Sequence, residues 1–257
     1  MIGFNHLGKL GRFGNQMFQY AALRGIAAHN EYDFCIPASS NSGNVYEHQL
    51  FIPFNLDINV NEIDGQYIQD DLFCFNEGIF DHCPDNISLI GYFQSEKYFH
   101  HIKKEIKKDF IFKDNIFDAC KETINKFKNP ISLHIRRTDY LTNPNHNTLS
   151  LEYYEEALKK FDSSREVVIF SDDPEWCENQ ELFNSDRFLI SKGQDAYHDM
   201  CLMTLCDDHI IANSSFSWWG AWLSENNKVV APSKWFDGGN LSHLNTKDLI
   251  PDEWEKV

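Results

Sequence analysis

The chain of 257 residues is short of basic residues and has no long apolar run. It carries 23 lysines and arginines against 39 aspartates and glutamates, which gives a formal net charge of −16. Nucleic-acid backbones attract a positive surface, so this charge excludes nucleic acid as the main partner. No apolar stretch has the length of a signal-peptide core or of a bilayer span. We therefore expect a cytoplasmic protein without a transmembrane segment, with peripheral contact at the inner membrane left open.

Cysteine and histidine lack the spacings of a disulfide framework or a metal centre. The seven cysteines are an odd number without a CxxC pair, which favours reduced thiols in a reducing compartment. His6, His134 and His198 have no metal-ligand spacing, and no DxD segment occurs that could hold a metal diphosphate. We therefore expect neither a metal nor a cofactor.

The hydrophobic content of 42% is enough for one large domain or two smaller ones. From about residue 129 onward, short apolar runs alternate with segments of helical periodicity. Strands are predicted at 131–137, 166–173, 187–191, 209–215 and 228–235, and helices at 151–161, 174–183, 195–207 and 216–225. This alternation predicts an α/β fold with a parallel sheet covered by helices on both faces.

The first half of the chain is less regular. Strands are predicted at 3–10, 32–36 and 87–93, and helices at 15–30 and 95–110. The segment 39–86 is rich in Asn, Asp and Gly and gives only weak signals. The stretch "KFKNP" at 126–130 ends a helix before a new strand, so we predict two domains, 1–128 and 129–257.

Polar clusters follow four of the predicted strands. They are "HIRRTD" at 134–139, "SDD" at 171–173, "NSS" at 213–215 and "PSK" at 232–234. Ligands of open parallel sheets bind outside the carboxyl ends of the strands, beside helix N-termini. The four clusters are therefore predicted to line one crevice.

Arg136 and Arg137 stand together in a chain with few bases. Arginine presents a planar fork of donors that stays charged, and two of them at a strand end can hold a phosphate from two sides. Neighbouring strand residues point to opposite faces, so both reach one ligand only if the strand has ended, as Thr138 and Asp139 suggest. The alternative is pairing with surface carboxylates. The position at a strand end, just after His134, favours the ligand.

Three further segments have both a structural and a ligand-binding interpretation. Gly11 and Gly14 would let backbone amides approach a ligand at the start of a helix, but two glycines also make an ordinary tight turn. The segments "SDD" at 171–173 and "NSSF" at 213–216 could bind a ligand or only cap the helices that follow. The residues alone leave these alternatives open.

Five segments together resemble the alpha-1,2-fucosyltransferases of glycosyltransferase family eleven. They are "GRFGNQMFQYA" at 11–21, "GYFQSEKYF" at 91–99, "HIRRTDY" at 134–140, "FSDD" at 170–173 and "NSSFSWWGAWL" at 213–223. The resemblance extends over almost the whole chain. It implies a GT-B-like fold of two facing Rossmann-like domains with parallel sheets. The C-terminal domain, 129–257, would bind GDP-fucose, and the N-terminal domain, 1–128, would lie on the acceptor side.

The resemblance also assigns roles to single residues. Arg136 and Arg137 would hold the diphosphate and stabilise the departing GDP in place of a metal, with Asp139 as a third catalytic residue. The donor-binding residues would be Gly11, Gly14, Asn15, His134, Asp172, Asp173, Ser214, Ser215 and Phe216. Among them, His134 and Asp173 would contact guanosine, and the two serines would donate to phosphate oxygens. Asp139 and His146 both remain open as the catalytic base.

The resulting hypothesis is an inverting, metal-independent transfer of L-fucose from GDP-fucose to the 2-hydroxyl of a terminal galactose. The acceptor would be an oligosaccharide or a glycolipid. One alternative is another metal-independent GT-B glycosyltransferase with a different sugar or linkage, and another is a non-catalytic protein that binds GDP or a glycan. We expect the segment 39–86 to line the acceptor side, because the resemblance implies that loops of the N-terminal domain face the donor in a GT-B cleft. Long loops also vary most freely.

Overall fold

The computed structural model describes residues 1–40, 47–70, 73–225 and 227–257. These residues form two compact α/β units, each built on its own sheet. Unit 1 comprises Met1–Lys113 and Asn245–Pro251, and unit 2 comprises Asp114–Leu244 and Asp252–Val257. Within the segment 39–86 that we expect on the acceptor side, positions 41–46 and 71–72 lie outside the described residues.

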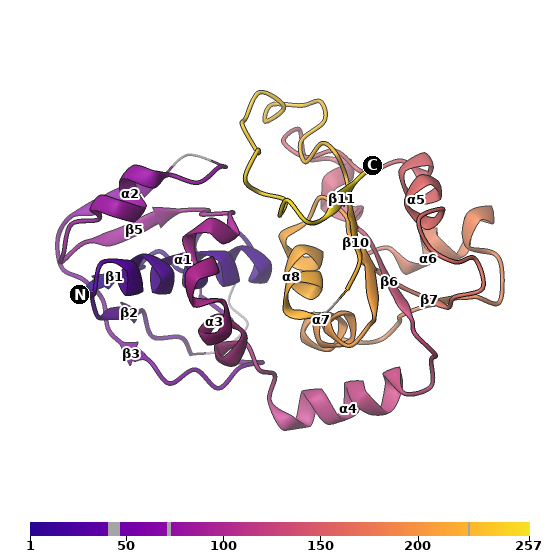
Figure 1. Ribbon diagram of the computed structural model, residues 1–257, viewed down its shortest axis with the longest axis horizontal. Coiled ribbons are helices and arrows are strands. Elements are labelled where there is room, and N and C mark those ends of the chain that lie inside the picture. Colours follow the sequence, from indigo (N-terminus) through magenta and orange to yellow (C-terminus); the bar gives the residue numbers. More distant parts are fainter. Residues whose placement is uncertain (41–46, 71–72, 226) are drawn as a thin grey trace. The chain divides into compact units, whose positions relative to one another are not determined.

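The described strands of unit 1 form a five-stranded parallel sheet (Figure 1). In spatial order they are β3 (Asn59–Val60), β2 (Phe34–Ile36), β1 (Ile2–Gly3), β5 (Ser88–Gly91) and β4 (Tyr67–Asp70). The helical segments are α1 (Phe13–His29), α2 (Glu77–His82), η1 (Glu96–Tyr98), η2 (His100–Ile102) and α3 (Lys103–Asp109). The chain runs from β1 to β2 and β3 on one side, and β5 and β4 lie on the other. The strand order therefore reverses between β1 and β5.

Helix α1 is apolar or small on nearly every face and is buried along most of its length. A helix with this composition belongs inside a core rather than at a surface. Gly25 allows a close approach, because a Cβ atom at this position would lie 1.9 Å from the main-chain oxygen of Tyr98. The sequence of α1 therefore suits tight packing against β1, β2 and the turn η1.

Two predicted elements of unit 1 differ from the structure. The strand predicted at 3–10 is limited to β1, because the chain turns after Gly3 and Asn5 forms hydrogen bonds with the main chain of Ile63. The helix predicted at 95–110 is divided into η1, η2 and α3, because Phe99 leaves helical geometry where its side chain enters the core.

The described strands of unit 2 form a six-stranded parallel sheet. In spatial order they are β11 (Glu255–Lys256), β10 (Val229–Ala231), β9 (Asp208–Ile210), β6 (Ile131–Ile135), β7 (Val167–Ser171) and β8 (Phe188–Ile190). The chain runs from β6 to β7 and β8 on one side, and from β9 to β10 and β11 on the other. This order, with its reversal between β6 and β9, is that of doubly wound nucleotide-binding sheets.

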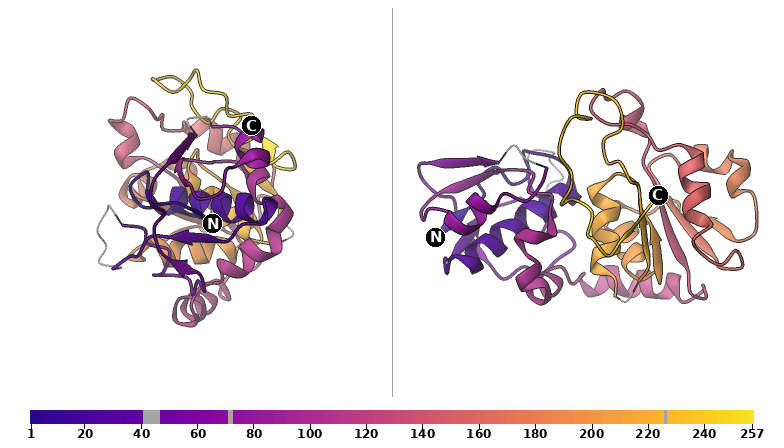
Figure 2. Two further views of the ribbon diagram at one scale, coloured as in Figure 1. Left: turned by 90° about the vertical axis from the view of Figure 1, so that its left-hand side faces the viewer. Right: turned by 45° about the horizontal axis from the view of Figure 1, so that its top comes forward.

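Helices cover both faces of this sheet, as the strand-helix alternation predicts (Figures 1 and 2). Helices α5 (Leu151–Leu158) and α6 (Pro174–Glu178) cover one face, where Tyr154 and Cys177 pack in one core with Leu133 of β6. Helices α7 (Ala196–Thr204) and α8 (Ser215–Leu223) lie on the other face. The remaining helical segments are α4 (Asp114–Ile124), η3 (Thr138–Leu141) and η4 (Glu181–Phe183).

The division between the units falls at 113/114, whereas we predict the domain boundary at 128/129. The difference is helix α4, which packs against α7 and brings the Cys120 thiol 3.5 Å from the main-chain oxygen of His198. The segment 245–251 also returns to unit 1, where Asp248 pairs with Lys97 at 2.5 Å. Helical periodicity shows that α4 has a buried face, but it does not show which sheet that face belongs to.

Candidate functional site

The candidate site of unit 2 lies where the strand order reverses, at the carboxyl ends of β6 and β9. Open parallel sheets bind ligands at this point, because the connections leave the two strands in opposite directions and open a crevice. "HIRRTD" spans the end of β6, "NSS" follows β9, and "SDD" ends β7 beside β6. Asp172 of "SDD" bonds to Arg137 of "HIRRTD", and Tyr140, which follows that segment, bonds to Asn213 of "NSS". In the fourth cluster, Lys234 pairs with Asp237 at 3.2 Å, and Ser233 bonds to Val257.

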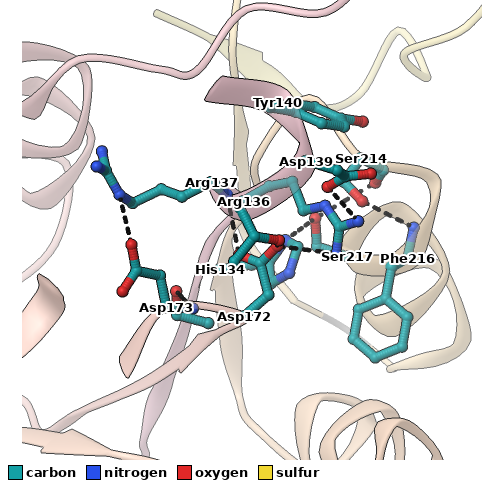
Figure 3. A network of polar contacts seen from close by, with 12 residues as sticks. His134, Arg136, Arg137, Asp139, Tyr140, Asp172, Asp173, Ser214, Phe216 and Ser217 are labelled. Atoms are coloured by element: carbon teal, nitrogen blue, oxygen red, sulfur yellow. Dashed lines mark hydrogen bonds and ion pairs between the residues drawn. The ribbon is translucent and has the colours of Figure 1, made fainter. Parts of the chain in front are cut away.

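Arg136 is held between two carboxylates. One terminal nitrogen lies 2.6 Å from Asp139, and the other lies 3.2 Å from Asp172 (Figure 3). The guanidinium also lies 5.4 Å from the ring centre of Tyr140, which adds a cation–π contact. The side chain is 17% exposed, so these partners largely enclose it.

Arg137 takes a different direction from Arg136 in Figure 3, toward Asp173. Its Nε donates to Asp173 at 3.2 Å, and its guanidinium lies 3.8 Å from the ring centre of Trp176. Within the described part of the chain, its two terminal nitrogens form no hydrogen bond. Arg137 therefore presents an oriented, charged fork of donors that an incoming anion can use.

The two arginines do not converge in this structure, although strand β6 ends at Ile135, before both of them. The expectation that both hold one diphosphate stays a prediction. Each guanidinium is already balanced by carboxylates, so a diphosphate would have to share Arg136 with Asp139 and Asp172.

Asp172 and Asp173 connect the end of β7 to the loop after β6. Asp172 accepts from the main-chain N–H of Arg137 at 2.9 Å and from the hydroxyl of Thr138 at 2.5 Å. Asp173 caps α6 by accepting from the N–H of Trp176 at 3.2 Å, in addition to its bond with Arg137. The cap expected for "SDD" is thus present. A carboxylate can accept up to about four bonds, so these contacts leave acceptor capacity for a ligand.

His134 is buried at the end of β6, with only 5% of its surface exposed. Its Nδ1 lies 2.9 Å from the hydroxyl of Ser217 in α8, and its ring lies 5.6 Å from that of Phe216. Burial, assisted by the charge of Arg136, lowers the pKa of His134 to about 3. The imidazole is therefore neutral, so it can recognise a base edge but adds no charge to a phosphate site.

The N-terminus of α8 brings the serines of "NSS" to the same region. Ser214 is the N-cap, and its hydroxyl accepts from the N–H of Phe216 at 3.4 Å. Ser215 is the first helical residue and is half-buried, with no hydrogen bond from its hydroxyl among the described contacts. The N-terminus of a helix favours an anion, so this end of α8 suits a phosphate.

Tyr140 links the loop after β6 to the loop after β9. Its hydroxyl donates to the main-chain oxygen of Asn213 at 3.2 Å. Its ring stacks on His146, with ring centres 4.5 Å apart and planes at 10°. Burial lowers the pKa of His146 below its ordinary value, although the nearby charge of Asp139 opposes this. A neutral imidazole therefore lies in the same cluster as Arg136 and Asp139.

Gly11, Gly14 and Asn15 belong to unit 1, at the carboxyl end of β1. Gly14 and Asn15 lie in the first turn of α1, and Gly11 has a left-handed φ of +80° just before it. A Cβ at Gly11 would lie 2.1 Å from the side-chain nitrogen of Asn15. Both the turn and this close approach therefore require glycine, which agrees with the tight-turn interpretation and leaves the ligand interpretation a prediction.

Sequence reasoning assigned no role to three residues that complete the unit 2 cluster: Tyr140, Trp176 and Ser217. For two of them, the position in the sequence could have indicated that they belong to the cluster. Ser217 lies three residues after Ser214, so both occupy one face of the helix start. Trp176 lies in the first turn after "SDD", within reach of that cluster. Their partners, His134 and Arg137, come from another strand and could not be inferred from spacing.

Two negative findings concern metals and membranes. Across residues 1–40, 47–70, 73–225 and 227–257, no group of three or more His, Cys, Asp or Glu side chains is placed to hold a metal ion. Within the same described residues, no helix combines the length and the apolar character needed to cross a bilayer.

Comparison with known proteins gives a consistent result. A family model described as "Glycosyl transferase family 11" matches residues 2–256. The O-antigen biosynthesis glycosyltransferase WbnK of Escherichia coli is 36% identical over 179 residues, covering 63% of this chain and 59% of the relative. The alpha-1,2-colitosyltransferase of the same organism is 35% identical over 185 residues, covering 67% and 63%. The galactoside alpha-(1,2)-fucosyltransferase 1 of Alouatta caraya is 27% identical over 245 residues, covering 85% and 65%. This chain thus spans less than two thirds of the length of each of these relatives.

Solved structures share the fold. POFUT1 in complex with GDP superposes with a TM-score of 0.58 at 13% identity, covering 90% of this chain and 97% of that one. The fucosyltransferase NodZ from Bradyrhizobium superposes with a TM-score of 0.56 at 12% identity, covering 85% and 91%. The expected GT-B-like architecture of two α/β units with parallel sheets is therefore confirmed.

Proposed function

The chain belongs to glycosyltransferase family 11, and on this basis we propose that it transfers L-fucose from GDP-fucose to the 2-hydroxyl of a terminal galactose on a glycan. The reaction would invert the anomeric configuration and need no metal. The relative named as a galactoside alpha-(1,2)-fucosyltransferase supports both the sugar and the linkage.

The observation that carries this proposal is the meeting of "HIRRTD", "SDD" and "NSS" at the strand-order reversal of unit 2. The cluster offers a charged fork on Arg137, a second guanidinium on Arg136 and the N-terminus of α8. These are the groups that neutralise a diphosphate without a metal. The neutral imidazole of His134 beside them suits the uncharged base of a nucleotide.

In the proposed reaction, the acceptor oxygen forms a bond to the anomeric carbon while the bond from that carbon to the phosphate oxygen breaks. GDP leaves with the bonding electrons, so negative charge grows on its terminal phosphate. Donors already oriented toward this phosphate stabilise the transition state more than the ground state. Arg137 has free terminal donors for this role, and Asp139 would orient Arg136.

The proton of the acceptor hydroxyl must pass to a base or to the departing phosphate. We favour His146 of the two candidates, because the carboxylate of Asp139 is engaged by Arg136 at 2.6 Å. Burial lowers the pKa of His146, which keeps the imidazole in the neutral form that can accept a proton but makes it a weaker base.

A second candidate function is transfer of colitose, which lacks the 3-hydroxyl of fucose. It is favoured by the 35% identity to an alpha-1,2-colitosyltransferase. A site that bonds to the 3-hydroxyl would reject the analogue that lacks it. The ratio of kcat/KM for GDP-fucose and GDP-colitose with one acceptor therefore decides between the two donors.

The proposed function is tested by incubating the purified chain with GDP-fucose and lactose, with and without EDTA. We expect GDP release in step with a product whose fucose is joined by an α bond to the galactose 2-oxygen, at a rate that EDTA leaves unchanged. GDP binding without any product would support the non-catalytic alternative. Loss of activity in EDTA with recovery in Mg²⁺ or Mn²⁺ would exclude the metal-independent mechanism.

We also propose that the protein acts in the cytoplasm, with a glycan or glycolipid acceptor at the inner membrane. The O-antigen role in the name of the E. coli relative WbnK supports an acceptor of this class. Product analysis against a panel of galactose-terminated glycans would identify it.

A further inference from the structure

The segment "GYFQSEKYF" contributes a buried amide, Gln94, that the proposed reaction leaves without a role. Gln94 follows β5, and Asn15 lies in the first turn after β1. These two strands are neighbours, and the strand order of unit 1 reverses between them. The two residues therefore occupy the edge and the position at which a parallel sheet binds its ligand.

Gln94 makes one direct contact with Asn15. Its Nε2 donates to the Oδ1 of Asn15 at 2.6 Å. This bond occupies the acceptor atom of Asn15, so the donor atom of the same amide, Nδ2, is left for another partner. Nδ2 forms no hydrogen bond within the described part of the chain.

The surroundings hold both amides in place. Gln94 is 6% exposed and lies in a tight turn in which the N–H of Ser95 bonds to the oxygen of Phe93 at 2.9 Å. Phe93 has a left-handed φ of +51°, and Ser95 caps the next turn. On the other side, Gly11 leaves the space that the Asn15 nitrogen occupies. The fixed side-chain nitrogen of Gln94 and the space left beside Gly11 thus set the orientation of the Asn15 amide.

The other polar atom of Gln94 indicates a ligand. Its Oε1 is buried and has no hydrogen-bond partner among the described residues. A buried carbonyl oxygen without a partner is destabilising, and structures rarely retain one without a reason. An acceptor left open at the carboxyl edge of a parallel sheet indicates that the pair formed by Gln94 and Asn15 faces a ligand.

We propose that Gln94 is a positioning residue that orients the Asn15 amide so that its N–H groups donate to an oxygen of the bound nucleotide sugar. This inference rests on the proposed function for the identity of the substrate. Gln94 acts through Asn15, so its contribution to turnover depends on the presence of that amide. The two residues thus form one unit of the substrate site.

A double-mutant cycle on the full chain tests the activity of this unit, using Gln94→Met, Asn15→Ala and their combination. We expect Gln94→Met to lower kcat/KM for GDP-fucose by about 10- to 100-fold, as misplaced substrate contacts do. In the Asn15→Ala background the same change should have almost no further effect. The matched control is Gln66→Met, an exposed amide of the same unit, which should leave kcat/KM unchanged. Full additivity of the two losses, or wild-type kcat/KM in Gln94→Met, would overturn the proposal.

A stability measurement tests the contact without any substrate. Asn15→Asp keeps the oxygen that Gln94 donates to, so its Tm should stay near that of the wild type. Gln94→Glu places oxygen against oxygen and should lower Tm clearly. The reverse order would show that the amides are oriented oppositely and would overturn the inference. If the two variants show this order of Tm values but the wild type does not transfer fucose, only the proposed function fails.

Discussion

The carboxylate of Asp172 lies 3.2 Å from a terminal nitrogen of Arg136, across the ends of two neighbouring strands. The same carboxylate bonds to the main-chain N–H of Arg137 and to the hydroxyl of Thr138. The turn that follows β6 is therefore shaped by the residue that follows β7. The direction of both arginine side chains therefore depends on a residue of the neighbouring strand. A substitution that tests either arginine should change the geometry of its donors while it keeps the positive charge.

Replacing Arg137 by Lys tests whether its forked donors stabilise the departing phosphate. Lys keeps the charge but loses the planar fork that stacks on Trp176. Loss of one oriented donor to a developing oxyanion typically lowers kcat by about 10²–10³. We expect this loss in Arg137→Lys, with a Tm close to that of the wild type, and a similar loss in Arg136→Lys if it too contacts phosphate.

The control for both changes is Arg165→Lys. Arg165 pairs with Asp208 and bonds to the oxygen of Asn129, at the amino ends of β9 and β6. Its replacement alters a similar ion pair at the opposite edge of the sheet and should leave kcat unchanged. Near-wild-type kcat in both Arg136→Lys and Arg137→Lys would show that these arginines have only a structural role.

The two functions of Asp173 can be separated by two substitutions. Asp173→Asn retains an oxygen for the α6 cap but loses the charge that faces Arg137, whereas Asp173→Ala loses both. We expect the Ala variant to lose about 1 kcal/mol of unfolding free energy, which is typical of a lost cap. GDP affinity, measured by calorimetry, should fall in both variants. Unchanged GDP affinity in a folded Asp173→Ala would remove this residue from the donor site.

Gly11→Ala and Gly193→Ala form a matched pair, because both glycines have a left-handed φ, of +80° and +75°. Each substitution carries the backbone strain of about 1 kcal/mol. Only at Gly11 does the new Cβ meet another atom, the Asn15 nitrogen at 2.1 Å, while nothing lies within 4 Å at Gly193. We expect a larger fall in Tm and a loss of activity in Gly11→Ala alone. If Gly11→Ala and Gly193→Ala lower Tm equally and change the transfer activity equally, the contact of the new Cβ with Asn15 has no consequence.

His209 should make the protein less stable in acid. Burial lowers its folded pKa from 6.5 to about 3, so below pH 6.5 the unfolded chain binds a proton that the folded chain does not. The contribution of the neutral, buried His209 to the free energy of unfolding is fully present above pH 6.5 and is lost as the pH falls toward 3. The slope approaches about 1.4 kcal/mol per pH unit for each such group.

His209→Asn tests this slope, because Asn can keep the bond to the hydroxyl of Ser132 that His209 Nδ1 forms at 2.6 Å. Urea unfolding of both proteins between about pH 7.5 and pH 4.5 should show a smaller loss of stability in the variant. His134 remains in both proteins and contributes equally. Parallel profiles for the two proteins would mean that His209 is protonated in the folded state.

The α/β class and the location of the unit 2 cluster were accessible from the sequence. Alternating apolar and helical segments after residue 129 predict buried parallel strands, because each element must bury its own apolar face. The clusters after β6, β7 and β9 are visible in the sequence as polar residues that follow apolar runs. Five segments also resembled one family, and a family model that matches residues 2–256 confirms this.

Tertiary structure alone determined how these residues meet. Sequence periodicity reports the burial of one element at a time, whereas strand order and side-chain direction depend on how distant elements pack. The divergence of Arg136 and Arg137 therefore depends on Asp139, Asp172 and Asp173, which lie on two different strand ends. The bond between Asn15 and Gln94 joins residues 79 positions apart, because β1 and β5 become neighbours only when the sheet of unit 1 has formed.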